Sequence, residues 1–213
     1  MKSLKLFLLI TCFPSMIFAQ QDLKQSQVQF INKHLVRSDA SIVAGFLIKH
    51  DISNVHLDGS LEYYLDNRVS VRGSASYMLG SSGLTKDSMG LKDFHTIMLG
   101  GAYHFHTNNH FDPYLIIQPG VAYTSSYKAT YTHDSNYSTP VKQYEGVLSP
   151  LGTAGLGFNY YFQRFAHLYM ETRYVYGRHL SSAPSVISLQ ELRITFGLGF
   201  NLFIIKDKKI PGE

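Results

Sequence analysis

The stretch ELRITFGLGFNL, residues 191–202, alternates without a break between two kinds of side chain. Successive side chains of a β-strand point to opposite faces, so this two-residue period predicts a strand. One face is uniformly apolar, whereas the other carries an acid, a base, small residues and an amide. A strand with one oily face and one polar face is typical of a transmembrane β-barrel if the rest of the chain repeats it.

The beginning of the chain reads as an export signal. Residues 1–19 contain early lysines, a short apolar run and a small-residue cleavage site before Gln20. The apolar run is too short for a spanning helix, which needs about 20 residues. Lipidation at Cys12 is disfavoured because the bulky Thr11 precedes it. Cys12 is the only cysteine, so the mature chain is expected to contain no disulfide.

Composition narrows the class of protein further. The formal net charge is +4, and removal of Lys2 and Lys5 with the signal leaves +2. So small a positive charge does not indicate nucleic-acid binding. No later segment approaches the roughly 18 unbroken apolar residues of a membrane helix. A chain of this kind could enter a membrane only as a closed barrel, because open sheet edges leave backbone groups unsatisfied in hydrocarbon.

Eight segments repeat the alternation or are compatible with it. We expect strands at about 40–50, 56–66, 68–79, 94–106, 113–127, 146–161, 167–178 and 188–204. The predicted fold is therefore all-β, a single eight-stranded antiparallel up-and-down transmembrane β-barrel over residues 40–204. Residues 20–39 are read as a periplasmic lead-in, and residues 205–213 as a periplasmic tail.

Loop lengths and aromatic residues give this barrel a direction. Connections after the even-numbered strands are short, whereas 80–93, 128–145 and 178–187 are longer and polar, as in the extracellular loops of such barrels. Aromatic side chains are expected to form girdles at the two membrane interfaces. The periplasmic girdle would contain Tyr63, Tyr103, Phe105, Tyr114, Tyr160, Tyr161, Phe162, Phe165, Phe200 and Phe203, and the outer one Tyr77, Phe94, Tyr123, Tyr127, Tyr174 and Tyr176.

Several phrases resemble the small outer-membrane β-barrel proteins related to OmpA, OmpX and OmpW. They are LEYYL (61–65), DPYL (112–115), GLGFNYYF (155–162), ETRY (171–174) and GLGFNLF (197–203). The resemblance covers residues 40–204 and implies residence in the outer membrane, contact with its lipid and lipopolysaccharide, and insertion by the barrel assembly machinery. Family members often end on an aromatic residue, whereas this chain continues to residue 213 as a basic tail.

Charged residues recur on the expected inner face. Glu171 and Arg173 repeat as Glu191 and Arg193 on the next strand. These four are expected to align into a buried ladder that meets a further pair across the lumen, Glu62 and Arg72. The ladder could be a gate or contain a catalytic carboxylate. We favour a structural role, in which paired charges fill a barrel that is too narrow for a channel.

Two other clusters raise chemical alternatives. His179-Leu180-Ser181 resembles the His-x-Ser of barrel enzymes that deacylate lipid A, in which His activates Ser and a carboxylate orients His. The spacing after Arg173 differs from that family, and the nearest acid, Glu191, should point inward. His104, His106 and His110 with Asp112 could chelate a metal, but a hydrogen-bonded turn is favoured and neither metal nor cofactor is expected.

The sequence thus favours a non-enzymatic outer-membrane barrel with a filled lumen and a structural or surface-interaction role through loops 80–93, 128–145 and 178–187. Three alternatives remain open. They are a lipid A-modifying enzyme, a minor pore for small solutes, and a soluble lipocalin-like barrel whose oily face points inward.

Overall fold

The computed structural model describes residues 30–105, 110–131, 138–180, 183 and 185–202. The predicted signal at 1–19, the first half of the lead-in and the tail lie outside these residues. The described residues form β1 (Val36–Leu47), β2 (Ile52–Tyr64), β3 (Val69–Ser82), β4 (Met89–His104), β5 (Phe111–Tyr131), β6 (Ser138–Tyr161), β7 (Ala166–Gly177) and β8 (Glu191–Leu202). None of them belongs to a helix long and apolar enough to cross a membrane.

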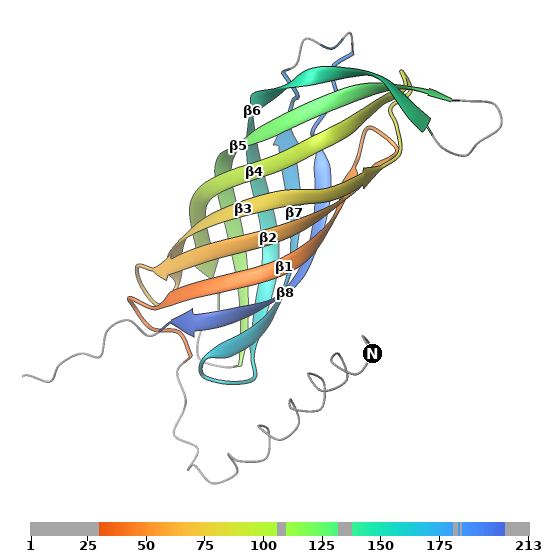
Figure 1. Ribbon diagram of the computed structural model, residues 1–213. Coiled ribbons are helices and arrows are strands. Elements are labelled where there is room, and N and C mark those ends of the chain that lie inside the picture. The colour runs from red at the N-terminus through yellow and green to blue at the C-terminus, as the bar shows by residue number, and fades with distance from the viewer. Residues whose placement is uncertain (1–29, 106–109, 132–137, 181–182, 184, 203–213) are drawn as a thin grey trace, which may run out of the picture.

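The eight strands close into one antiparallel barrel in sequence order (Figure 1). Every strand pairs with its neighbours in the chain, and β1 completes the ring by pairing with β8, with Val36 opposite Leu202. The fold class and strand number expected from the alternation are confirmed. Short turns, such as 65–68 and 162–165, join the strands at one end of the barrel, here called the short-turn end. The other end is called the long-loop end.

Several strand limits differ from the sequence-based expectation. β1 begins at Val36 rather than at residue 40, so the end of the expected lead-in belongs to the barrel. The expected loop 80–93 shrinks to 83–88, and that at 128–145 is largely the extended hairpin of β5 and β6 (Figure 1). Pairs such as Lys128 opposite Lys142 continue the backbone ladder without an oily face. The alternation used to set strand limits is therefore missing there.

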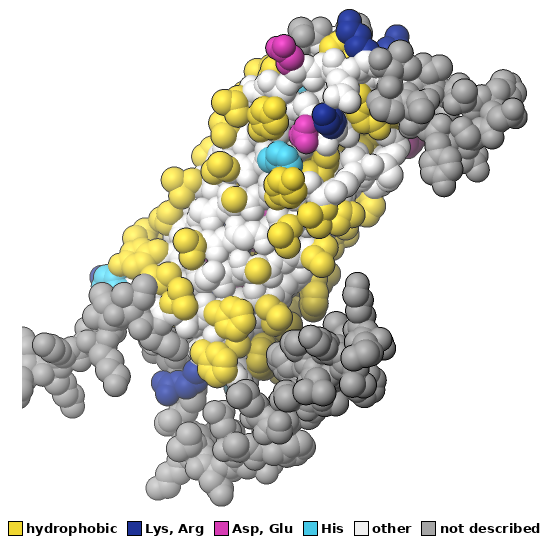
Figure 2. All heavy atoms as spheres, viewed as in Figure 1, with side chains coloured by type: hydrophobic (Ala, Val, Ile, Leu, Met, Phe, Trp, Pro, Cys, Tyr) yellow, Lys and Arg dark blue, Asp and Glu magenta, His cyan; other side chains and the backbone are white. Residues whose placement is uncertain are grey.

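The apolar face of the strands points away from the barrel. Ile97 and Ile117 are 67 % and 68 % exposed, and every second residue of β8 from Leu192 to Leu202 is exposed. Figure 2 shows hydrophobic side chains over the flank of the barrel, with the charged side chains that are visible lying mainly towards its ends. The inner residues of β8, from Glu191 to Asn201, are all buried. This orientation excludes the lipocalin-like alternative, which requires the oily face inside.

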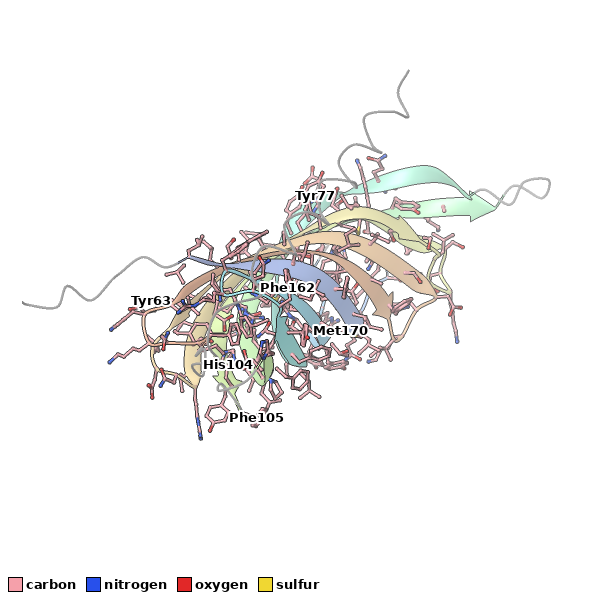
Figure 3. All side chains as sticks on the ribbon, turned by 90° about the horizontal axis from the view of Figure 1, so that it is seen from below. Tyr63, Tyr77, His104, Phe105, Phe162 and Met170 are labelled. Atoms are coloured by element: carbon pink, nitrogen blue, oxygen red, sulfur yellow. The ribbon has the colours of Figure 1, made fainter. Side chains whose placement is uncertain are left out.

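Three residues assigned to the aromatic girdles point into the lumen instead. Tyr114, Tyr161 and Phe94 are at most 1 % exposed, so their assignment to the outer surface was wrong. Most of the other girdle residues that the structure describes lie outside, including Tyr63 and Phe105, which point away from the barrel in Figure 3. Phe203 lies outside the described residues.

The lumen is filled in three layers. At the short-turn end, Phe30, Ile31 and Leu35 pack against Tyr64 and Tyr161. Charged and polar side chains fill the middle. Towards the long-loop end, an apolar cluster is completed by residues of the β7–β8 connection, and it contains Leu47, Ile52, Met78, Met89, Leu91, Phe94, Met98, Ala122, Leu151, Val175, Ala183, Ile187 and Leu189.

Candidate functional site: the charged lumen

Glu62 on β2 is the centre of the charges nearest the short-turn end. It accepts hydrogen bonds from Arg72 Nη2 at 2.8 Å and Nε at 3.1 Å, and it also pairs with Arg37 of β1. The second oxygen lies 3.1 Å from Nε2 of His104, whose Nδ1 lies 2.9 Å from Asp112. His104 therefore bridges two carboxylates, and Figure 3 shows its place among the lumen side chains.

Arg72 extends this group across the lumen to β7. Its Nη1 donates to Oε2 of Glu171 at 2.9 Å, and the hydroxyl of Tyr114 donates to the same oxygen at 2.7 Å. Arg173 donates to the other oxygen of Glu171 and lies 3.9 Å from Asp58. Since an unpaired buried charge is costly, these contacts explain how so many ionised groups fit in one closed space.

A second charged group lies around Glu191, the first residue of β8. Its carboxylate accepts from Arg193 Nε at 2.5 Å and from Asn54 Nδ2 at 2.7 Å, and His56 Nε2 lies 3.4 Å away. The Arg193 guanidinium also lies over the ring of Phe94, 5.0 Å from its centroid. The apolar cluster at the long-loop end thus begins where this group ends.

The strand register differs from the single ladder that we expected. Arg173 and Arg193 lie directly opposite each other, while Glu171 faces Thr195 and Glu191 faces Val175. Like charges in opposed positions repel, so each arginine turns along its own strand to the glutamate two residues earlier. The six expected residues, Glu62, Arg72, Glu171, Arg173, Glu191 and Arg193, are all at most 3 % exposed but form two groups.

Sequence reasoning missed several members of the lumen network. Arg37 and Asp39 were placed in the lead-in, and His167, whose Nε2 lies 3.1 Å from Asp39, was not considered. A detectable signal was present, because Arg37, Asp39 and Ser41 alternate with less polar residues and continue β1 towards the N-terminus. That alternation would also have assigned the faces of β1, whose later residues are apolar on both sides.

The His179 region is arranged differently from an acyl-transfer site. The His179 ring is buried, with Nδ1 2.6 Å from the Thr124 hydroxyl and Nε2 3.3 Å from that of Ser126. Both nitrogens thus face hydroxyl groups of β5, and Glu191 is held by the contacts described above. Ser181 lies outside the described residues. Burial lowers the pKa of His179 below its usual 6.5.

The histidines near β4 do not assemble a metal site within the described part of the chain. No group of three His, Cys, Asp or Glu side chains there could hold a metal ion. His104 is engaged by Glu62 and Asp112, and the ring of His110 packs 4.8 Å from that of Phe30. His106 lies outside the described residues.

A closed ring of eight antiparallel strands, oily outside and charged inside, defines a small β-barrel of the outer-membrane type. Solved structures confirm this class at the level of fold. OprG of Pseudomonas aeruginosa matches with a TM-score of 0.57 and 15 % identity, over 82 % of this chain and 99 % of that one. Neisserial surface protein A matches with 0.54 and 15 %, over 79 % and 96 %.

The N-terminal β-barrel domain of Pseudomonas aeruginosa OprF matches with a TM-score of 0.51 and 19 % identity, over 80 % of this chain and 98 % of that domain. No family model and no curated protein matches the sequence. At these levels of identity, the likeness extends to the fold and no further.

Proposed function

We propose that this chain is a non-enzymatic outer-membrane barrel with a closed lumen, which anchors its long-loop end at the cell surface for structural or binding purposes. The short-turn end would face the periplasm. The outward apolar face, the aromatic side chains near both ends and the likeness to outer-membrane barrels support this placement. In the same arrangement, the export signal expected at residues 1–19 would bring the chain to the envelope.

The closed lumen rests on one observation above all. The six lumen charges expected from the sequence are between 0 and 3 % exposed, although a water-filled channel would leave such groups accessible. They lie between two apolar layers, formed by Phe30, Ile31, Leu35, Tyr64 and Tyr161 at one end and by the larger cluster at the other. Small solutes would have to displace these side chains in order to pass.

Conductance in planar bilayers tests this proposal. We expect purified, folded protein to give no stable conductance steps, because apolar side chains and paired charges fill the described part of the lumen. A general diffusion porin prepared in the same detergent shows that the assay detects open channels. Stable steps whose number rises with the amount of folded barrel would contradict the closed lumen.

The surface role would belong to the long-loop end. The expected loop regions 80–93, 128–145 and 178–187 all lie there, with much of the first two regions formed as paired strand. Paired strands restrict the backbone more than an open loop does, which favours recognition of a partner at a lower entropic cost.

A further inference from the structure

A groove lies outside the barrel at the long-loop end, where β6, β7, the β7–β8 connection and the β1–β2 turn meet. Its volume is about 650 Å³. Tyr176 forms one wall and is 63 % exposed, and Leu180 and Val186 expose apolar surface beside it. Gly152, opposite Tyr176 on the neighbouring strand, leaves the floor open, because no atom lies within 4 Å of the place where a Cβ would be.

Two cations line this groove and no acidic side chain does. Lys49 comes from the β1–β2 turn and Arg178 from the residue after β7, and both are exposed. Within the described ranges of the chain, neither cation forms an ion pair. Arginine binds phosphate oxygens through two parallel N–H donors, and lysine adds a compact point charge. The groove is therefore complementary to a phosphate group.

The position of the groove, at the edge of the apolar outer face, points to a lipid as the source of that phosphate. Tyr176 and Leu148 are strongly exposed on the outer face of β7 and β6, so the apolar belt reaches the edge of the groove. Arg178 follows two residues after Tyr176, just beyond the last residue of β7. Cations at this position would meet headgroups, while apolar walls next to them would meet acyl chains.

We propose that this groove binds one phosphorylated lipid of the outer leaflet. Lys49 and Arg178 hold a phosphate of the headgroup, and Tyr176, Leu180 and Val186 contact an acyl chain. This inference depends on the proposed placement in the outer membrane and adds a lipid partner to it. A free phosphate ion would use the cations alone and leave the apolar walls without a role.

Native mass spectrometry of the full mature chain in lipid nanodiscs tests the proposal. The discs contain phosphatidylcholine with either bisphosphorylated lipid A or the same lipid after removal of its phosphates. The test variant is Lys49→Gln with Arg178→Gln. The matched control is Lys86→Gln with Lys92→Gln, which removes two exposed positive charges from the same end of the barrel. A gel comparing boiled and unboiled samples first verifies insertion of every variant.

We expect the wild-type chain and the control to retain one phosphorylated lipid A, and the test variant to bind it about tenfold more weakly. Equal binding by the test and control variants would overturn the proposal. So would equal binding of the dephosphorylated lipid, or displacement of lipid A by inorganic phosphate, which would indicate a small-anion site. A wild-type chain that does not insert would refute the proposed function, whereas an inserted chain without lipid preference would refute only this inference.

Discussion

At the scale of single residues, Glu62 joins most of the charges near the short-turn end. Its carboxylate contacts four side chains, those of Arg37, Arg72, His104 and Ser70. Removal of one partner from a buried ion pair is more costly than its net contribution suggests, because the remaining charge stays buried without compensation. The stability of this layer therefore depends on the charge of one side chain.

We predict that Glu62→Gln lowers the free energy of unfolding by about 3 kcal/mol, since two arginines lose their shared counter-charge. Reversible urea unfolding in lipid vesicles measures this change. Glu145→Gln is the matched control, because Glu145 is exposed, and its effect should stay below about 0.5 kcal/mol. Similar losses in both variants would show that the buried network has no special energetic role.

The sequence predicts which face of a strand a residue occupies more reliably than it predicts which residue lies opposite on the neighbouring strand. The two-residue spacing predicts an inner position for Glu171, Arg173, Glu191 and Arg193, and all four are buried in the structure. The opposition of Arg173 to Arg193 depends on the register between strands, which one strand's pattern does not contain. Tyr160 and Tyr161 are both expected in the girdle because aromatic residues are common at interfaces, but only Tyr160 is exposed.

At the scale of elements, the residues before β1 close the short-turn end. Phe30 stacks on Tyr161 with 5.2 Å between ring centroids and is 6 % exposed. We predict that Phe30→Ala lowers the free energy of unfolding by about 3 kcal/mol, the usual cost of truncating a buried aromatic side chain. Chemical denaturation measures it. Phe165→Ala is the control, since Phe165 is half exposed in a turn, and its loss should be smaller.

The β7–β8 connection carries a second testable element. Burial disfavours the charged ring of His179, so its pKa in the folded chain lies below the usual 6.5. The contribution of His179 to the free energy of unfolding is therefore fully present above pH 6.5. It is lost as the pH falls through 6.5 towards the lower pKa of the folded state. His50, in the β1–β2 turn, has a pKa lowered by burial and by Lys49, with the same sign.

We predict that His179→Asn makes the unfolding free energy less dependent on pH on the acidic side of 6.5. The wild type should lose more stability than the variant as the pH falls, because only the wild type must keep a buried imidazole neutral. Unfolding curves collected at several pH values for both chains measure the difference. Parallel pH profiles would show that the ring titrates as freely in the folded protein as in the unfolded one.

Limits of elements were predictable only where one face is apolar. The tight turns at the short-turn end were placed closely, because oily alternation runs up to them. The sequence predicts a loop for the part of β5 and β6 at the long-loop end, since no apolar face accompanies Lys128 and Lys142, which the structure pairs. Backbone hydrogen bonds alone support such a hairpin. Because every residue type can form them, the side-chain pattern does not reveal them.

At the scale of the whole molecule, closure of the ring predicts resistance to detergent. Each strand pairs on both sides through the body of the barrel, so local separation of one strand breaks two ladders at once. We predict that sodium dodecyl sulfate leaves the unheated chain folded and that boiling unfolds it. Gel migration measures this, with the unheated band running ahead of the boiled one. Identical migration of both samples would contradict a closed membrane barrel.

The contact between β1 and β8 has a consequence for biogenesis. Before these strands meet, the nascent sheet has two free margins, with Arg37 and Asp39 near one and Glu191 and Arg193 near the other. A sheet that had not yet closed would expose these ionised groups to acyl chains in the bilayer, at a high desolvation cost. Pairing of β1 with β8 before or during entry into the bilayer would keep these groups out of hydrocarbon, and a factor that shelters both free edges until they pair would suit this chain.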